Sequence, residues 1–221
     1  MAKNIQKLSN IDFYAILDTG YVARDMLYKK CKELIAGNVD IIQLRAKKQS
    51  PLEIAKIASE ISPLFEEENA PIFIINDDLK LAKSIDFAGL HLGQDDIDCR
   101  IARQELGEDR VLGLSTHSLE QATKANELYD ILDYFAVGPV YPTNTKLGRP
   151  AVGLELLRQV SSLELKLPFF AIGGINFETA KSALEYGAKR LVAVSAILEQ
   201  ENSAQAIAKM RDIIKDELSK I

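Results

Sequence analysis

The sequence predicts an α/β fold: one (β/α)8 barrel of the TIM type over residues 1–221, with residues 1–11 as an N-terminal extension. Eight short apolar runs alternate with amphipathic stretches, and no low-complexity or Pro/Ser-rich linker interrupts them. A length of 221 residues corresponds to one domain, or at most two small ones. Eight strand–helix units in such a chain favour a closed barrel over an open doubly wound sheet, because closure leaves no edge strand.

The eight apolar runs are rich in β-branched and aromatic residues, and several end in Gly, Asn or Asp. Short apolar runs of this kind are typical of parallel strands that are buried on both faces. We therefore expect strands at Phe13–Leu17, Val39–Leu44, Ile72–Ile75, Ala88–Leu92, Val111–Leu114, Tyr134–Val137, Phe169–Ile172 and Leu191–Val194.

The segments between the runs carry helical patterns. The first apolar stripe, with i, i+4, i+7, i+8 spacing, consists of Leu27, Cys31, Leu34 and Ile35. The second runs from Ile54 to Phe65, and Ser50-Pro51 can start its helix as N-cap and first residue. Further helices are expected at Asp78–Ile85, at Leu119–Leu128 after the cap Ser118, at Phe177–Tyr186 between the cap Asn176 and Gly187, and at Ser203–Lys220.

Composition and charge exclude several classes of protein. Apolar residues make up 47% of the chain, which is too high for a disordered protein. Since 32 acidic residues outnumber 27 basic ones, no basic stripe is expected for nucleic acid. No uncharged stretch approaches the roughly 18 apolar residues of a membrane helix, and Cys31 and Cys99 lack metal-ligand spacing. We expect a cytoplasmic protein; a homo-oligomer is compatible with the sequence, which does not set the number of subunits.

The active site of such a barrel lies where the strands end, so the polar residues after each run are the candidates. In the second run, strand alternation places Gln43, Arg45 and Lys47 on one side, towards the barrel mouth. A Gln and an Arg inside an apolar strand are costly to bury without partners, which favours a ligand. For Lys47, a solvated strand end is an equally good interpretation.

Acidic residues follow the third and fourth runs. Asp77 and one acid of the Asp95–Asp96 pair should lie at adjacent strand ends, where two carboxylates without a basic partner repel each other unless a cation binds. Mg2+ is typically held by one or two carboxylates together with substrate phosphates. The alternative for Asp78 and Asp95 is that each caps the next helix. His91, inside its strand, is expected to be a hydrogen-bonded core residue rather than a catalyst.

The later strand ends offer groups suited to anions. Ser115 follows the fifth run, and the long connection after the sixth contains Thr143, Thr145 and Lys146, two hydroxyls and an ammonium group. Gly173-Gly174 and Ser195 follow the seventh and eighth runs, where backbone amides commonly bind phosphate in these barrels. The sequence therefore predicts two anion-binding regions, one of them with Mg2+.

Seven motifs in the same order resemble those of the thiamine phosphate synthase family, from Phe13 to about Leu198. They are QLRAK at Gln43–Lys47, Asn76-Asp77, HLGQDD at His91–Asp96, GLSTHS at Gly113–Ser118, GPVYPTNTK at Gly138–Lys146, AIGGI at Ala171–Ile175 and VSAI at Val194–Ile197. The resemblance implies a TIM-type barrel enzyme that joins hydroxymethylpyrimidine diphosphate to thiazole phosphate and releases pyrophosphate, with Mg2+ as cofactor.

The resemblance also implies roles for individual residues. Gln43 would orient the aminopyrimidine, and Asp77 and Asp96 would bind Mg2+. The diphosphate would be held by Arg45, Lys47, Asn76, Ser115 and Lys146, of which all but Asn76 would act in catalysis. The thiazole phosphate would be held by Thr143, Thr145, Gly174, Val194 and Ser195. The implied reaction is dissociative: pyrophosphate leaves first and the thiazole nitrogen captures the resulting pyrimidinylmethyl cation.

Two departures and two alternatives accompany this resemblance. Ala46 stands where the family commonly has an acidic residue, and Asp78 where a basic residue often follows Asn-Asp. The nearest alternative is the thiazole tautomerase relatives, which use a histidine at the position of His117 but tend to lose the diphosphate residues. The other is a non-catalytic barrel that senses thiazole phosphate, which would need no Mg2+ site.

Overall fold

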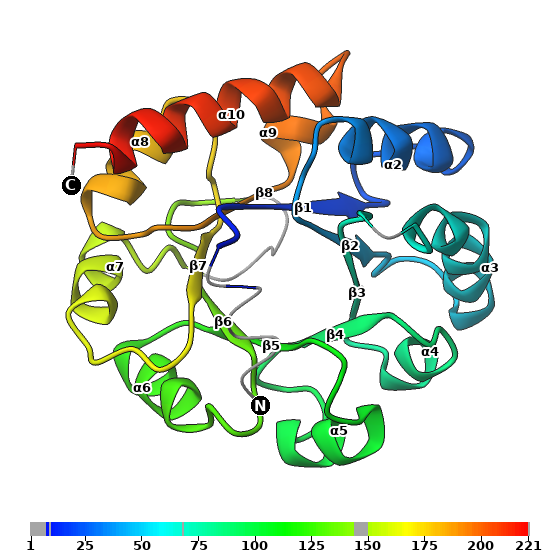
Figure 1. The fold of residues 1–221 in the computed structure, drawn as a ribbon, viewed down its shortest axis with the longest axis horizontal. Helices are drawn as coiled ribbons and strands as arrows, with labels where there is room; N and C mark the ends of the chain where they lie inside the picture. Colours follow the sequence, from blue (N-terminus) through cyan, green and yellow to red (C-terminus); the bar gives the residue numbers. More distant parts are fainter. Residues whose placement is uncertain (1–7, 9, 68, 144–149, 221) are drawn as a thin grey trace.

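Eight parallel strands close into one barrel in the computed structural model, which describes residues 8, 10–67, 69–143 and 150–220 (Figure 1). The strands follow one another in chain order, and β8 pairs with β1 to close the ring. The predicted (β/α)8 barrel is therefore confirmed. The strands are β1 (Phe13–Asp18), β2 (Ile41–Arg45), β3 (Ile72–Asn76), β4 (Gly89–Leu92), β5 (Leu112–Thr116), β6 (Tyr134–Val137), β7 (Phe169–Ile172) and β8 (Leu191–Ala193).

Helices form the outer layer around the strands (Figure 1). Four of them, η1, α5, α7 and α9, lie in segments for which the sequence patterns above predicted no helix bounds. The helices are η1 (Arg24–Met26), α2 (Leu27–Ala36), α3 (Pro51–Ile61), η2 (Ser62–Phe65), α4 (Leu79–Lys83), α5 (Cys99–Leu106), α6 (Leu119–Glu127), α7 (Leu154–Ser161), α8 (Ala180–Glu185), α9 (Ser195–Leu198) and α10 (Ser203–Leu218).

The caps explain where several helices begin and end. The Ser50 hydroxyl accepts a hydrogen bond from the Glu53 amide and the Glu53 carboxylate accepts one from the Ser50 amide, so α3 starts with a capping box, as Ser50-Pro51 predicts. Pro63 cannot continue an α-helix, and the predicted stripe reaches Phe65 through the 3-10 turn η2 instead. Ser118 caps α6 as predicted.

Several predicted boundaries are wrong by one to three residues, and two of these differences, in α8 and β2, have a clear cause or consequence. The helix expected from Phe177 begins at Ala180, because the Asn176 side chain accepts the amides of Glu178 and Thr179 and holds residues 177–179 in a turn. Strand β2 covers Ile41–Arg45 rather than Val39–Leu44. Lys47 therefore lies beyond the strand, and the alternation that was expected to align it with Gln43 and Arg45 does not extend to it.

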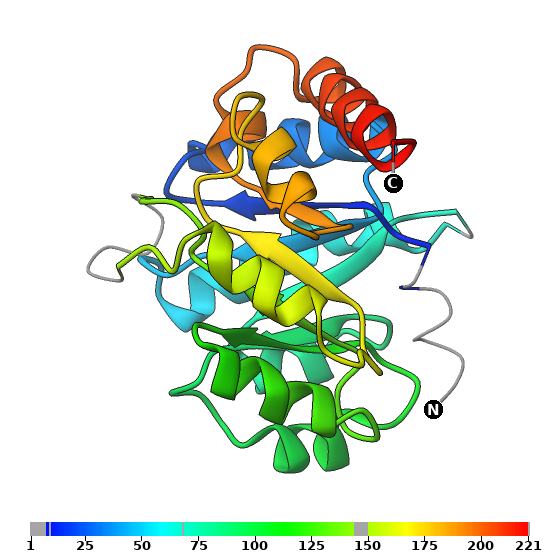
Figure 2. The same ribbon diagram turned by 90° about the vertical axis from the view of Figure 1, so that its left-hand side faces the viewer.

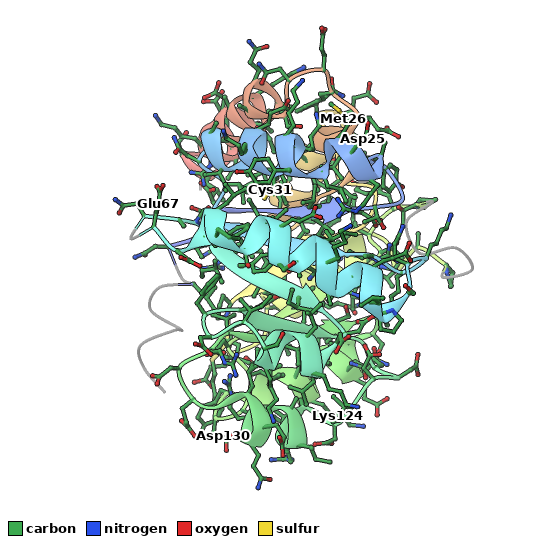
Figure 3. All side chains as sticks on the ribbon, turned by 90° about the vertical axis from the view of Figure 1, so that its right-hand side faces the viewer. Asp25, Met26, Cys31, Glu67, Lys124 and Asp130 are labelled. Carbon is green, nitrogen blue, oxygen red and sulfur yellow. The ribbon has the colours of Figure 1, made fainter. Side chains whose placement is uncertain are left out.

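The core has two parts. An inner cluster fills the barrel with aromatic and branched side chains, among them Tyr14, Tyr134 and Phe170. An outer cluster lies between the strands and the helices and includes Cys31, on the inward face of α2 (Figure 3). Lys124 and Asp130, by contrast, are exposed at the protein surface. In the part of the chain that the structure describes, no helix is long and apolar enough to cross a bilayer.

Leu8 and Ile11, which precede β1, close the amino-terminal end of the barrel. Leu8 is fully buried in the inner cluster, and its carbonyl accepts a hydrogen bond from the Arg190 guanidinium at 3.3 Å. The arrows of β1 and β7 point to the same side of the molecule, away from the residues that lead into β1 (Figure 2). Leu8, which belongs to the predicted N-terminal extension, thus contributes to the core, because an apolar side chain can fill the open end of the barrel.

An ion-pair cluster links the last helix to the amino-terminal end of the strands. Arg211 of α10 lies 2.6 Å from the Asp40 carboxylate and 3.6 Å from that of Asp12. Asp40 also accepts the backbone amide of Phe13. Burial, partly offset by Arg211, raises the pKa of Asp12 above its ordinary value.

We expect Asp12→Asn to raise the thermal unfolding temperature at pH 7 and to have no effect near pH 3. Because the pKa of Asp12 is higher in the folded than in the unfolded chain, its contribution to stability is fully present below the unfolded value and is lost as the pH rises through the folded one. Thermal melts of both proteins between pH 3 and pH 7 measure the difference. The surface variant Asp130→Asn is the control, and a stabilisation that does not depend on pH would contradict this account.

Candidate active site

A pocket opens at the carboxyl ends of the strands and holds about 800 Å³ of space between atoms, including its open mouth. Apolar side chains such as Ile16 and Val192 form part of the wall, and polar side chains come from strands on several sides. The lining includes eight of the residues predicted from the sequence: Gln43, Arg45, Asn76, Ser115, Thr143, Gly174, Val194 and Ser195. The position at the carboxyl ends of the strands agrees with the usual location of active sites in this fold.

Strand β2 supplies Gln43 and Arg45, two residues apart and therefore on the same side of the strand. The Arg45 guanidinium donates to the Asp18 carboxylate at the end of β1, at 2.6 Å, and both side chains are largely buried. Asp18 also accepts the Gly20 amide at 2.8 Å, so its position is fixed from two sides. The guanidinium is thus held at the pocket wall by a carboxylate that the sequence patterns did not single out.

Lys47, Asp77 and Asp96 form a cluster beside this pocket rather than in its lining. The Lys47 ammonium pairs with the Asp77 carboxylate, and the Asp77 and Asp96 carboxyls are within hydrogen-bonding reach. The assumption of two carboxylates without a basic partner is therefore wrong, because Lys47 lies close enough to neutralise one of them. Burial, with a contribution from Asp96, raises the pKa of Asp77 although Lys47 lowers it.

Local backbone geometry brings the two acids together. Asp77 continues the ladder between β3 and β4 by donating its amide to the His91 carbonyl at 2.9 Å, and it adopts a positive φ of 63°. Asp96 accepts the Gly93 amide at 2.6 Å, which turns its carboxylate back towards the end of β4. A left-handed backbone at a residue other than glycine is costly, and such strain clusters at functional sites.

The neighbouring acids behave differently from each other. Asp78 caps α4 by accepting the Leu81 amide at 2.9 Å, as the alternative interpretation predicts. Asp95 is not the cap of the next helix, because Asp98 occupies that position before α5. The capping prediction is therefore confirmed for Asp78 and wrong for Asp95.

Hydrogen bonds connect His91 and Ser115 to tyrosines inside the barrel. His91 lies 2.8 Å through Nδ1 from the Tyr134 hydroxyl and 2.9 Å through Nε2 from the Ser115 hydroxyl. Gln43 donates to the Tyr14 hydroxyl at 2.5 Å, and the hydroxyls of Tyr14 and Tyr134 are 3.2 Å apart. His91 is thus the hydrogen-bonded interior residue that the sequence predicts, although it also borders the pocket.

The turn after β7 is built from Gly173 and Gly174, with φ values of 99° and 66°. A Cβ on Gly174 would lie 2.6 Å from the Cβ of Tyr141, and one on Gly173 would overlap Pro139. The connection after β6 therefore packs directly on this turn, and the Tyr141 amide donates to the Gly173 carbonyl at 3.0 Å. Only glycine allows both the backbone conformation and this close approach.

The other predicted anion-binding residues lie around the same turn. Val194 and Ser195 follow β8, and Ser195 is the first residue of the short helix α9. Thr143 reaches the pocket from the connection after β6. Thr145 and Lys146, which belong to the same connection, lie outside the described residues.

Whether this site suits Mg2+ depends on its donors. In the described part of the chain, no group of three or more His, Cys, Asp or Glu side chains is arranged to hold a metal ion. Asp77 and Asp96 nevertheless form a close carboxyl pair, and Mg2+ needs only one or two protein carboxylates when phosphates and water complete its shell. Burial and the neighbouring Asp96 carboxyl raise the pKa of Asp77, and a cation held by the two carboxyls would lower it. The residues therefore fit the ion.

Residues 13–197 match a family model described as thiamine monophosphate synthase. The chain belongs to this family. Among similar proteins, the thiamine-phosphate synthase of Persephonella marina is 33% identical over 207 residues, which cover 94% of this chain and 97% of that protein. The thiamine-phosphate synthase of Mycolicibacterium gilvum is 42% identical over 189 residues, covering 80% of this chain and 78% of that one.

Solved structures agree with membership of the thiamine monophosphate synthase family. The thiamine phosphate pyrophosphorylase of Pyrococcus furiosus superposes with a TM-score of 0.81 at 28% identity, covering 94% of this chain and 97% of that one. A 3-hexulose-6-phosphate synthase, at a TM-score of 0.62 and 20% identity, shares the fold alone; it covers 92% of this chain and 99% of that one. The match extends over most of the barrel in each case.

Three residues of the site were missed by reasoning from the sequence. Asp18 directly follows an apolar run, and Asp77 follows another after one intervening residue. An acidic residue at the end of a strand was the signal that could have identified Asp18. Tyr14 and Tyr134 lie within apolar runs, where aromatic residues are expected for packing alone. The register of the strands directs both side chains into the barrel, and this shows that their hydroxyls belong to the site.

Proposed function

We propose that this chain joins 4-amino-2-methyl-5-hydroxymethylpyrimidine diphosphate to 4-methyl-5-(2-hydroxyethyl)thiazole phosphate, giving thiamine phosphate and pyrophosphate. The observation that carries the proposal is the cluster of Lys47, Asp77 and Asp96 beside the pocket wall that holds Arg45. A barrel that only isomerises or senses a thiazole phosphate has no use for this cluster. The thiamine-phosphate synthases that resemble the chain carry the same activity in their names.

The pyrimidine is assigned to the floor of the pocket, against Gln43. This side chain is 2% exposed and is oriented by the Tyr14 hydroxyl, so its carboxamide has a defined direction. A fixed amide can recognise an aminopyrimidine, which presents donors and acceptors on one edge. Ile16 and Val192 supply apolar surface beside it.

The diphosphate is assigned to the side of the pocket formed by β2, β3 and β5. Arg45, Asn76 and Ser115 offer donors there, and Lys47 stands at the edge. The resemblance adds Lys146. When bound between Asp77 and Asp96, Mg2+ would neutralise part of the charge on the departing pyrophosphate.

The thiazole phosphate is assigned to the opposite wall, where Thr143, Gly174, Val194 and Ser195 line the pocket. Phosphate sites of these barrels commonly use the turns after strands 7 and 8. The two anions thereby lie on different sides of the pocket, which leaves the space between them for the two rings. The thiazole nitrogen can then approach the pyrimidine methylene carbon.

The residues suit a dissociative reaction. As the bond between the methylene carbon and the diphosphate oxygen breaks, negative charge grows on pyrophosphate, and Arg45, Lys47 and Ser115 stabilise it. The thiazole nitrogen then captures the pyrimidinylmethyl cation. Its lone pair forms the new bond without losing a proton, so the step requires neither a protein nucleophile nor a general base.

Product formation from the two substrates tests the proposal. We expect thiamine phosphate and pyrophosphate in equal amounts with Mg2+ and none after EDTA treatment, with recovery on adding Mg2+. Consumption of the thiazole phosphate alone would instead support the tautomerase function, for which His117 at the pocket would be the candidate. The free, buried cysteines Cys31 and Cys99 agree with a reducing compartment, and we assign the reaction to the cytoplasm.

We expect Gly174→Val to raise the KM for thiazole phosphate by about tenfold or more, the effect of losing one hydrogen bond to a charged group. A side chain there would collide with Tyr141 at a φ of 66° and displace the turn. Steady-state kinetics with each substrate varied in turn measure the effect, and the KM for the pyrimidine diphosphate should not change. Gly107→Val, also at a positive φ but with open space around it, is the control. An unchanged KM for thiazole phosphate would show that the two anions have been assigned to the wrong sides of the pocket.

A further inference from the structure

The turn after β7 contains two consecutive peptide groups whose carbonyls are both anchored. The Gly173 carbonyl accepts the Tyr141 amide at 3.0 Å. The Gly174 carbonyl accepts the Thr179 hydroxyl at 2.8 Å. Among the described residues, Gly173, Gly174 and Ile175 line the pocket, whereas Tyr141 and Thr179 do not. The two donors therefore hold the turn from outside the pocket.

The anchored carbonyls also fix the direction of the amides of Gly174 and Ile175. Both peptide bonds are trans, and the C=O and N–H of a trans peptide point in opposite directions. The Gly174 N–H therefore points away from Tyr141, and the Ile175 N–H points away from Thr179. In the part of the chain that the structure describes, neither amide donates to another group. Both are thus available to an anion in the pocket.

The Thr179 hydroxyl has one proton, and its neighbours direct that proton to Gly174. The hydroxyl oxygen accepts the Asn176 amide at 2.9 Å. The Gly174 carbonyl lies 2.8 Å away, whereas Asn176 Oδ1 lies 3.2 Å away and already accepts the amides of Glu178 and Thr179. The shorter bond, to the Gly174 carbonyl, is therefore the stronger one.

The peptide group between Gly174 and Ile175 needs this bond to keep one orientation. At its far end, the Ile175 side chain is 4% exposed and belongs to the outer cluster, which holds that residue in place. At the near end, Gly174 has no side chain to pack, and glycine allows many backbone conformations. The Thr179 hydroxyl supplies the restraint that the glycine itself lacks.

We propose that Thr179 is a positioning residue: its hydroxyl orients this peptide group so that the Ile175 amide, together with the Gly174 amide, donates to the phosphate of the thiazole substrate. The proposal rests on the proposed function for the identity of that ligand. Successive backbone N–H groups in a turn form concave sites for anions. Ile175 and Thr179 were not among the site residues predicted from the sequence.

Selective isotope labelling gives each of the two amides its own NMR signal. Gly173-Gly174 is the only Gly-Gly pair in the sequence, and Gly174-Ile175 is the only Gly-Ile pair. Glycine labelled with 13C at its carbonyl, combined with either 15N-glycine or 15N-isoleucine, therefore isolates one amide in each sample. We expect both amide protons to shift downfield when inorganic phosphate is added to the wild-type protein, because each donates to the anion.

Thr179→Val keeps the shape of the side chain and removes the hydroxyl. We expect the Gly174 amide still to respond to phosphate, because Tyr141 still holds the Gly173 carbonyl, and the Ile175 response to be lost. The dissociation constant for phosphate should rise about tenfold, the effect of losing one hydrogen bond to a charged group. Thr179→Ser, which keeps the hydroxyl, should restore both.

Steady-state kinetics separate positioning from a general structural role. Thr179→Val should raise the KM for thiazole phosphate about tenfold and leave kcat and the KM for the pyrimidine diphosphate unchanged. A rise in both KM values, or a fall in kcat alone, would mean that Thr179 has only a structural role.

Two variants serve as controls. Phe177→Leu weakens the packing of the same turn and the contact of the Phe177 ring with the Lys209 ammonium, and it removes no hydrogen bond of the turn. Thr123→Val makes the same substitution on α6, where the hydroxyl donates to the Leu119 carbonyl at 2.9 Å. Both should leave the Ile175 response and the phosphate affinity unchanged. An equal loss in Phe177→Leu would show that loosening of the turn, and not the missing hydroxyl, weakens phosphate binding.

The wild-type protein alone can overturn the proposal, so a misfolded Thr179→Val does not prevent the test. If phosphate shifts the Gly174 amide and not the Ile175 amide, the anion site stands and the role of Thr179 fails. An Ile175 response that persists in a folded Thr179→Val would also overturn it. If both amides respond and the protein forms no thiamine phosphate, the proposed function fails, whereas the orientation of the turn by Thr179 stands.

Discussion

Asp77→Asn is expected to lower kcat/KM for thiamine phosphate formation by about 10²–10³, which corresponds to roughly 3–4 kcal/mol of transition-state stabilisation. The variant keeps the shape of the side chain and loses the charge that would hold Mg2+ beside the leaving pyrophosphate. Asp96→Asn should have an effect of the same order, because both carboxyls belong to the cluster. Steady-state kinetics over a range of Mg2+ concentrations measure the loss.

Asp78→Asn is the matched control for these two variants. It removes the same charge from the next residue along the chain, and asparagine can still cap α4 by accepting the Leu81 amide. We expect it to retain activity within a few-fold of the wild type. Near-normal activity of Asp77→Asn at limiting Mg2+, or an equal loss in Asp78→Asn, would show that the metal is not held by this pair.

Asp18→Asn is expected to destabilise the fold by about 3 kcal/mol, because it leaves the largely buried Arg45 guanidinium without its carboxylate. For a chain of this size the loss corresponds to a fall of roughly 6–12 °C in Tm. Pyrophosphate with Mg2+ should restore more stability to the variant than to the wild type, because its charge replaces that of Asp18 at Arg45. Thermal melts with and without pyrophosphate measure both effects.

Asp133→Asn provides the comparison. Asp133 forms a buried pair with Arg103 at 2.6 Å, just before β6 begins and therefore at the other end of the barrel from the pocket. This variant should lose stability of a similar order, whereas pyrophosphate should stabilise it no more than it stabilises the wild type. An equal response of the two variants to pyrophosphate would argue against Arg45 as a diphosphate contact.

The fold was predictable because its strands are buried on both faces. Such strands need apolar residues at successive positions, and these form recognisable apolar runs in the sequence. Boundaries were less predictable where side chains compete with the backbone. Asn176, for example, accepts two amides and delays the start of α8, and Pro63 converts the end of the second helical stripe into a 3-10 turn. Such interactions depend on local geometry that a periodic pattern does not contain.

The candidate site was predictable where polar residues interrupt an apolar strand or follow it, as with Gln43, Arg45 and Asp77. It was less predictable where a residue's partner comes from another strand. The pairing of Arg45 with Asp18 and of Lys47 with Asp77 depends on which strands are neighbours and on where each ends. Tyr14 and Tyr134 are 120 residues apart in the sequence, and only closure of the barrel brings their hydroxyls together.

Because the amino-terminal end of the barrel is closed, substrates and products must enter and leave the pocket at the same end. Leu8 and the aromatic layer of Tyr14, Tyr134 and Phe170 fill the interior beneath Gln43, so the described residues leave a blind pocket with its entrance at the carboxyl ends of the strands. A ligand on the floor of the pocket must therefore bind before, and leave after, any ligand that covers it. The proposed position of the pyrimidine at Gln43 leaves the thiazole nearer the entrance, so binding should be ordered with the pyrimidine diphosphate first. While it is bound, thiamine phosphate should block binding of the pyrimidine diphosphate. It should therefore act as an inhibitor that is competitive with respect to the pyrimidine diphosphate.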